Sequence, residues 1–143
     1  MFRRLISAKG QSRSAKTVEV FGWLILLEGT IVLFAPHFAI AVLGIEPLTP
    51  QAANYFRLVG LLVSGLGVLY VASGRLSAGG FVFASMLDRP LVPFAMAILW
   101  YLEILPGALA LIFSIQDFGS FLWTLFTWRR ENNPAEMRQS QPE

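Results

Sequence analysis

Four stretches of apolar residues, each long enough to cross a lipid bilayer, dominate this sequence. They run over residues 18–35, 53–73, 81–105 and 108–128. Roughly 18 to 20 apolar residues in a helix cover a hydrocarbon core about 30 Å thick, at about 1.5 Å per residue. Backbone N–H and C=O groups in lipid must be satisfied inside the segment, and a helix does this. The sequence therefore predicts an all-α integral membrane protein built as a four-helix bundle.

Composition supports lipid, rather than water, as the main solvent of the chain. The 143 residues are 55% hydrophobic and 14% charged, against roughly 25% charged residues in soluble domains. A soluble chain of this size leaves too much of its area in water to bury such a share of apolar side chains. We therefore expect the spans to contact the lipid bilayer, which is the predicted partner of this chain. The basic residues lie at segment ends and not on one face, so nucleic acid is not expected.

The charges outside the spans predict how the chain is oriented. Residues 1–17 form a basic segment, and residues 129–143 form a polar tail. Nine of the eleven Lys and Arg residues fall on one side of the membrane if there are four spans: Arg3, Arg4, Lys9, Arg13, Lys16, Arg75, Arg129, Arg130 and Arg138. The positive-inside rule then puts both termini in the cytoplasm. The expected location is the bacterial inner membrane.

A basic start followed by an apolar run is also the pattern of a cleavable signal peptide. The run over residues 18–35 is longer than the usual 7 to 15 residues of a signal-peptide core, and it contains Glu28. We therefore expect it to remain as the first span.

Two positions show where spans begin or break. Thr49-Pro50 has the pattern of an N-cap followed by the first helical residue of the second span. Asp88-Arg89-Pro90 interrupts the third span near its middle, and proline lacks the N–H that continues a helix. We predict that the third helix is kinked or broken there.

The second span carries small residues on one face. Gly60, Ser64 and Gly67 recur at positions i, i+4 and i+7. Small residues at that spacing let helix backbones approach closely in lipid. We expect them to pack inside one chain, with a homo-oligomer as the alternative.

Six polar or ionisable side chains fall inside the spans. They are Glu28, Arg57, Asp88, Arg89, Gln116 and Asp117. Counted at about 1.5 Å per residue, the groups of the first, third and fourth spans lie near the middle of the bilayer. A charge at the centre of a membrane helix costs on the order of 2.5–3.5 kcal/mol, so these groups should face one another. Arg57 starts closer to the outer face, from which its side chain reaches outward or down into the bundle.

This predicted polar cluster has two interpretations. In one, the charges neutralise each other and hold the helices in register, since buried pairs fix an arrangement with little net stability. In the other, the cluster is a binding or proton-handling site, which is the default for ionisable residues inside a membrane. Three carboxylates face two guanidinium groups, which leaves one carboxylate for a proton, a cation or a ligand that donates a hydrogen bond.

The sequence excludes most cofactor chemistry. It has no cysteine and a single histidine, so thiolate metal sites, iron–sulfur clusters and bis-histidine haem are not expected. No phosphate-binding glycine loop, nucleophile elbow or HExxH motif occurs. We therefore expect a non-enzymatic protein without metal or cofactor.

Two segments carry a family resemblance. They read FRLVGLLVSGLGVLYVASGR and GFVFASMLDRPLVPFAMAILWYLEILPGALALIFSIQDFGSFLWTLFTWRRE. Over about residues 20–131 the chain resembles the BphX-like family, small membrane proteins encoded among aromatic-degradation genes, notably those for biphenyl, in soil bacteria. The family has no established molecular function, so the resemblance implies a setting and no site residues. The layout is also similar to DoxX-like four-helix membrane proteins, some of which are associated with quinone-linked respiratory enzymes.

These observations lead to one main functional hypothesis and two alternatives. The main hypothesis is an inner-membrane accessory protein of an aromatic-catabolism system, which binds or passes a small hydrophobic aromatic compound at the polar cluster. The first alternative is a non-catalytic, quinone-interacting or scaffolding subunit held by a membrane protein partner. The second is a proton-coupled carrier, against which stand the small size and the lack of an inverted repeat.

Overall fold

The computed structural model describes residues 10–133 as six helices joined by short turns. They are α2 (Arg13–Phe34), α3 (Pro36–Val42), α4 (Pro50–Arg75), α5 (Gly79–Asp88), α6 (Leu91–Tyr101) and α7 (Gly107–Glu131). Four segments are long and apolar enough to cross a membrane: α2, α4, α5 with α6, and α7. The predicted all-α, four-span architecture is confirmed, and the chain is a multi-pass membrane protein.

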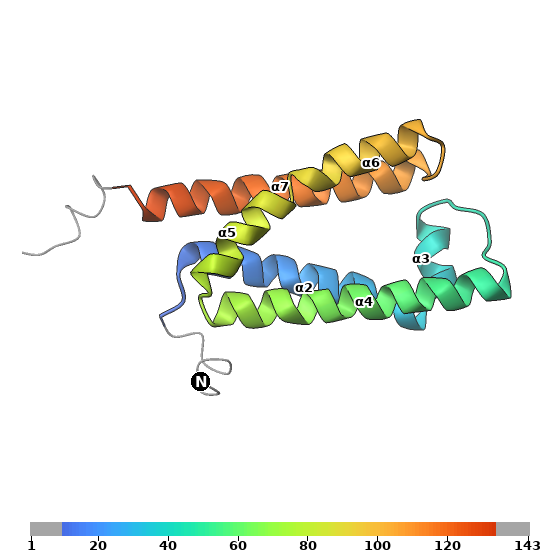
Figure 1. Cartoon of the computed structure of the whole chain (residues 1–143). Helices are drawn as coiled ribbons and strands as arrows, with labels where there is room; N and C mark the ends of the chain where they lie inside the picture. Colours follow the sequence, from blue (N-terminus) through green and yellow to red (C-terminus); the bar gives the residue numbers. More distant parts are fainter. Residues whose placement is uncertain (1–9, 134–143) are drawn as a thin grey trace, which may run out of the picture.

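The spans alternate in direction, so the bundle has two ends (Figure 1). We call the end that holds Arg13, Arg75 and Glu131 the basal end. The opposite end, which holds Phe34 and Pro50, is the distal end. Helix α5 begins at the basal end and crosses diagonally to α6, which runs beside α7 toward the distal end (Figure 1).

Side-chain caps set the starts of α2 and α4. The Ser12 hydroxyl accepts a hydrogen bond of 3.1 Å from the backbone N–H of Ala15, so α2 begins at Arg13. Helix α2 therefore includes residues 13–17 of the predicted basic segment, and residues 1–9 of that segment lie outside the described part of the chain. The Thr49 hydroxyl accepts a hydrogen bond of 3.3 Å from the backbone N–H of Ala52 and so caps the start of α4. This confirms the predicted N-cap.

The third span is broken, as predicted. Helix α5 ends at Asp88 and α6 starts at Leu91, with Arg89 and Pro90 between them. The span ends at Tyr101, four residues before the predicted boundary, because Glu103 turns the chain with a φ of 57°.

Two other boundaries differ from the prediction. Helix α7 continues to Glu131, so Arg129 and Arg130 form its last turn and not the start of the tail. Residues 134–143, with Arg138, lie outside the described part of the chain. The connection after the first span contains the short helix α3, which begins at Pro36 because proline suits the first turn of a helix.

Helices α2 and α4 approach each other very closely along two glycine-bearing faces. A methyl group at Gly29 would lie 2.4 Å from the backbone nitrogen of Ser64, and one at Gly60 would lie 2.5 Å from that of Leu33. At Gly67 the corresponding distance to Leu26 N is 2.6 Å. The predicted close packing of the second span is confirmed, and its partner is the first span of the same chain.

The bundle is not closed around all four spans. Helix α2 contacts both α4 and α7, and α7 contacts α6, whereas within residues 10–133 no contact joins α4 to α6 or α7. The spans therefore form an open row in the order α4, α2, α7, α6. Helix α5 bridges this row, because it contacts α2, α4 and α7.

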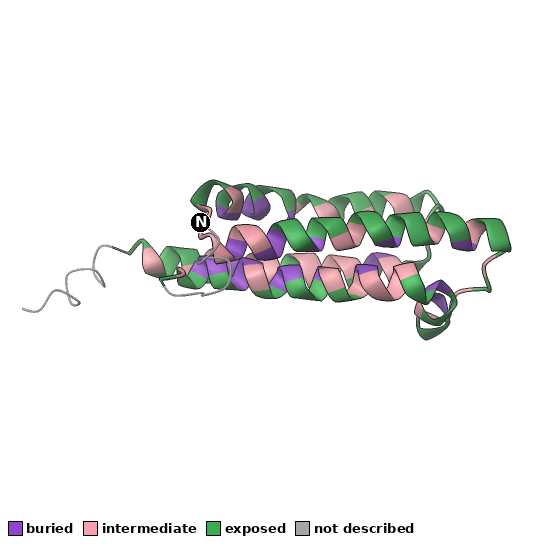
Figure 2. Ribbon diagram, turned by 90° about the horizontal axis from the view of Figure 1, so that it is seen from below, coloured by how far each residue is buried: buried purple, intermediate pink, exposed green. Residues whose placement is uncertain are grey.

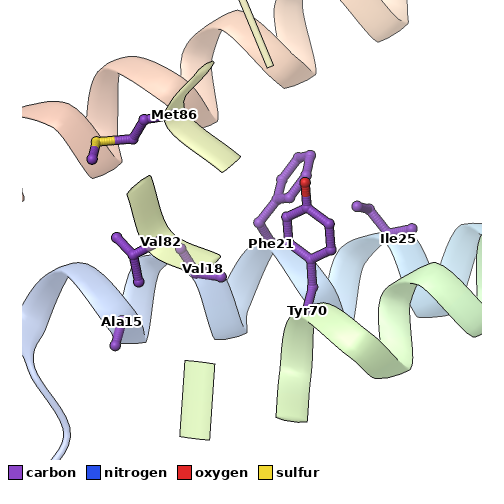
Figure 3. Close-up of a cluster of buried hydrophobic side chains, with 7 residues drawn as sticks. All are labelled: Ala15, Val18, Phe21, Ile25, Tyr70, Val82 and Met86. Carbon is purple, nitrogen blue, oxygen red and sulfur yellow. The ribbon is translucent and has the colours of Figure 1, made fainter. Parts of the chain in front are cut away.

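The apolar core lies in the basal half of the row. Figure 3 shows seven buried side chains there, from α2, α4 and α5. The Tyr70 ring packs edge-on against Phe21 at 5.6 Å and against Phe81 at 4.9 Å between ring centroids. Buried residues gather toward this end, while the outward faces of the spans are exposed (Figure 2). Such exposure of large apolar side chains is what lipid-facing helices require.

At the basal end, polar side chains tie the helix termini together. The Glu131 carboxylate accepts hydrogen bonds from the backbone N–H groups of Arg13 and Ser14 and from the Ser14 hydroxyl. The last turn of α7 thus caps the start of α2. Arg75 pairs with Glu19 at 2.8 Å, which joins α4 to α2.

Replacing Glu131 with alanine is expected to destabilise the basal end by about 1 kcal/mol, because two N–H groups at the start of α2 lose their acceptor. Amide hydrogen exchange in the first turn of α2 should become faster, and the global unfolding midpoint should fall only slightly. Glu131→Gln keeps one acceptor oxygen and should lose less protection. Unchanged exchange in Glu131→Ala would contradict this capping role.

Candidate functional site

A hydrogen bond between Glu28 and Gln116 is the central polar contact of the α2–α7 interface. Gln116 Nε2 donates to Glu28 Oε2 at 2.9 Å, and both side chains are half-buried. Each residue lies fifteen positions from the basal terminus of its helix, at Arg13 or Glu131. At about 1.5 Å per residue, that is about 22 Å from the basal end, in the distal half of both helices.

Arg89 lies at a lower level and is almost fully buried, with 1% of its surface exposed. Its Nη1 donates to the Thr124 hydroxyl at 3.1 Å, and that hydroxyl also contacts Thr17 Oγ1 at 2.8 Å. The guanidinium lies over the Phe21 ring at 4.1 Å and near the Tyr70 ring at 5.3 Å. Two aromatic rings and Thr124 therefore hold this cation where α2, α4, α5 and α7 meet, and Thr17 in turn contacts Thr124.

The Nε and Nη2 atoms of Arg89 have no close hydrogen-bond partner among the described residues, and the Tyr70 hydroxyl is the neighbouring group that acts most strongly on this guanidinium at longer range. A buried donor without a partner costs about 1–3 kcal/mol, so the neighbouring negative charges matter. The carboxylates of Asp117 and Asp88 act electrostatically on this guanidinium, and neither forms an ion pair with it within residues 10–133.

Asp117 lies between the two levels. It is half-buried on α7, and the charges of Arg89, Asp88 and Glu28 all act on it. Asp88, at the end of α5, is exposed on the surface of the monomer. The predicted cluster is therefore spread over two levels, with Glu28 and Gln116 about 12 Å distal to the level of Thr124.

Arg57 does not join the other five residues. Its side chain is exposed on α4 and donates to Asn54 Oδ1 at 3.2 Å, one turn closer to the distal end. A long cationic side chain near a span end gains more from reaching the membrane surface than from entering the bundle.

A pocket of about 220 Å³ opens beside Glu28 in the distal half. We call it the distal pocket. Helix α2 forms its floor, and α3 and α7 form its walls. The lining is Glu28, Ile31, Val32, Phe38, Ala39, Val42, Leu43, Leu109, Ile112 and Phe113. Apart from the Glu28 carboxylate, every lining residue is apolar.

A second pocket of about 380 Å³ lies between α2 and α7 in the basal half. We call it the basal pocket. It is lined by Val20, Phe21, Leu24, Gln116, Gly119, Ser120 and Trp123. Because Glu28 lines one pocket and Gln116 lines the other, their hydrogen bond lies between the two. Both pockets follow the same groove between α2 and α7.

Sequence reasoning missed several residues of this region. Thr124 follows Asp117 by seven residues, which places both on one face of α7, and that spacing was the available signal. Thr17 fell at the end of the predicted basic segment. Phe21 and Tyr70 gave no signal, because aromatic residues occur throughout the spans.

Within residues 10–133 no group of three His, Asp or Glu side chains is placed to hold a metal ion. Comparison with known proteins gives no match, either to a family model, to a curated protein or to a solved structure.

Proposed function

We propose that this protein is an inner-membrane accessory protein of a bacterial aromatic-catabolism system, and that it binds or passes a small hydrophobic aromatic compound at the distal pocket. One observation carries the proposal: an apolar pocket inside a membrane protein contains a single carboxylate, that of Glu28. The aromatic class comes from the resemblance to the BphX-like family.

The size and lining of the distal pocket support an occupant of about one substituted ring. Its volume is about 220 Å³, and a buried apolar cavity of roughly 150 Å³ is enough to hold benzene. Phe38 and Phe113 supply aromatic walls. Ligand sites are commonly apolar with a few polar groups that fix orientation.

Glu28 favours a ligand that donates a hydrogen bond. Gln116 occupies only Oε2 of this carboxylate, and Oε1 accepts no hydrogen bond within the described part of the chain. A phenolic hydroxyl would supply a donor, and a bond to a charged group contributes about 1.5–3 kcal/mol. An aromatic carboxylate would instead meet a like charge in an apolar setting, which is unfavourable.

The arrangement of basic residues supports a cytoplasmic basal end. Arg13, Lys16, Arg75, Arg129 and Arg130 all lie at that end of the spans. The distal end carries Arg57 as its basic residue within residues 10–133. By the positive-inside rule, the basal end would face the cytoplasm and the distal pocket the other leaflet.

Binding of toluene, p-cresol and p-toluate tests this function. Each compound has one methyl-substituted aromatic ring; p-cresol adds a hydroxyl group, p-toluate adds a carboxylate, and toluene adds neither. We expect p-cresol to raise the unfolding midpoint of the detergent-purified protein most, and p-toluate to have no effect. Glu28→Leu should weaken p-cresol binding by about ten-fold or more, because the hydroxyl loses its acceptor. Toluene binding should be unchanged.

Two further variants serve as controls in the same assay. Asp88→Leu removes an exposed carboxylate outside the distal pocket, and its midpoint should respond to each of the three compounds as that of the wild type does. Ile112→Trp fills the pocket and should abolish binding of both toluene and p-cresol. The proposal fails if no compound shifts the midpoint, or if Ile112→Trp binds as well as wild type.

A further inference from the structure

The basal pocket continues at its basal end into basic residues. On α2, Val20 lines the pocket, and Lys16 and Arg13 precede it by four and seven residues. On α7, Trp123 lines the pocket and Arg130 follows it by seven residues. Helical residues four or seven apart lie on one face. Three cations are thus aligned with the two walls of the groove.

Hydrogen bonds hold together the two helix termini that carry these cations. Glu131 on α7 bonds the backbone of Arg13 and Ser14 at the start of α2, which brings Arg130 beside Arg13. The side chains of Arg13, Lys16 and Arg130 are all exposed. The Glu131 carboxylate, which follows Arg130 in the chain, is already engaged by these hydrogen bonds and by the Ser14 hydroxyl.

The distance from the cations to the far end of the basal pocket matches one membrane leaflet. On α2, Leu24 is the last residue that lines the pocket, and it follows Arg13 by eleven residues, or about 16 Å. That is about half of a hydrocarbon core about 30 Å thick. The groove is open to the lipid side, since Val20 is 45% exposed and Trp123 is 51% exposed.

We propose that this groove binds one anionic phospholipid of the basal leaflet. An acyl chain would lie in the basal pocket along Val20, Leu24 and Trp123. The headgroup phosphate would lie among Arg13, Lys16 and Arg130. Apolar walls alone would accept any lipid chain, and the three cations give the preference for negative charge. This lipid site lies in the basal half of the groove, whereas the distal pocket lies in the distal half and contains none of the three cations. The lipid proposal is therefore independent of the function proposed above.

Phosphatidylglycerol with brominated acyl chains tests the site, because bromine quenches the fluorescence of a tryptophan it touches. We expect saturable quenching of the detergent-purified full chain, with brominated phosphatidylcholine binding more weakly. Arg130→Gln should weaken phosphatidylglycerol binding by about five-fold, the contribution of one cation near a membrane surface. Arg129→Gln is the matched control, because Arg129 is one position from Arg130 and lies off this face of α7. The affinity of this variant for phosphatidylglycerol should equal that of the wild type.

Trp123→Phe locates the bound chain. It should remove most of the phosphatidylglycerol-dependent quenching, because the other three tryptophans of the sequence lie outside the basal pocket. Equal losses in Arg130→Gln and Arg129→Gln would show an effect of net charge alone and overturn the proposal. Quenching that persists in Trp123→Phe would place the lipid elsewhere. Competition by soluble glycerol phosphate at similar concentration would show an anion site without acyl-chain binding, which also overturns it.

Discussion

Alanine in place of Gly60 is expected to force α2 and α4 apart and to destabilise the protein by at least about 2 kcal/mol. The added methyl group would lie 2.5 Å from Leu33 N and 2.8 Å from the Gly29 carbonyl oxygen. Both are backbone atoms of α2, so no side-chain rotation relieves the clash. In lipid, close backbone packing is a main source of helix association. Unfolding by sodium dodecyl sulfate in mixed micelles measures the loss.

Gly65 provides a matched control for this prediction. It lies on the same helix, and an added methyl group there would meet nothing within 4 Å. Gly65→Ala should therefore match or slightly exceed the wild-type stability, because alanine is the better helix former. Equal stability of Gly60→Ala and Gly65→Ala would show that the close approach of α2 and α4 contributes nothing to folding.

Replacing Arg89 with methionine is expected to destabilise the protein by about 3 kcal/mol. The volume is similar, but the half-buried Asp117 would lose a nearby positive charge with which it forms no ion pair, and the cation–π contact with the Phe21 ring, which contributes about 2 kcal/mol when desolvated, would be lost. The link from α5 to Thr124 would also be lost. Arg57→Met is the control, because that side chain is exposed and bonded only to Asn54 within the described residues, and its effect should stay within about 0.5 kcal/mol.

A second substitution separates charge from packing at this position. If the cost of Arg89→Met comes from an uncompensated carboxylate, Asp117→Asn in the same chain should recover at least half of the lost stability. A double variant that is no more stable than Arg89→Met alone would assign the loss to the Phe21 and Thr124 contacts instead. Both variants use the same mixed-micelle unfolding as above.

Some features of this fold follow directly from sequence, because they depend on local chemistry. Run length and composition predict the four spans, Pro90 predicts the break in the third, and Thr49 predicts the start of α4. Gly60 predicts close packing through its spacing. Its partner, Gly29 on α2, depends on how two distant segments align, and periodicity in one helix does not specify that alignment.

The candidate site could be predicted only in part for a related reason. Counting from span ends placed the polar residues of the first, third and fourth spans at one depth and Arg57 closer to the outer face. The hydrogen bond between Glu28 and Gln116 agrees with that count, but the count left open where the long arginine side chains point. Arginine side chains are long, so Arg57 turns toward the distal surface and Arg89 reaches Thr124, about 12 Å basal to Gln116. Thr17 belongs to the site because α2 begins at Arg13, before the apolar run that predicted the first span.

The open row of spans bears on how the protein is made. Its tightest interface, between α2 and α4, joins two spans that are consecutive in the chain, and α6 and α7 are likewise consecutive. The pair α2 and α4 and the pair α6 and α7 can thus each form a helical hairpin soon after insertion, since nascent chains fold from the N-terminus onward. The polar contacts between α2 and α7 would then form after both hairpins. Biogenesis would proceed as the docking of two preassembled halves.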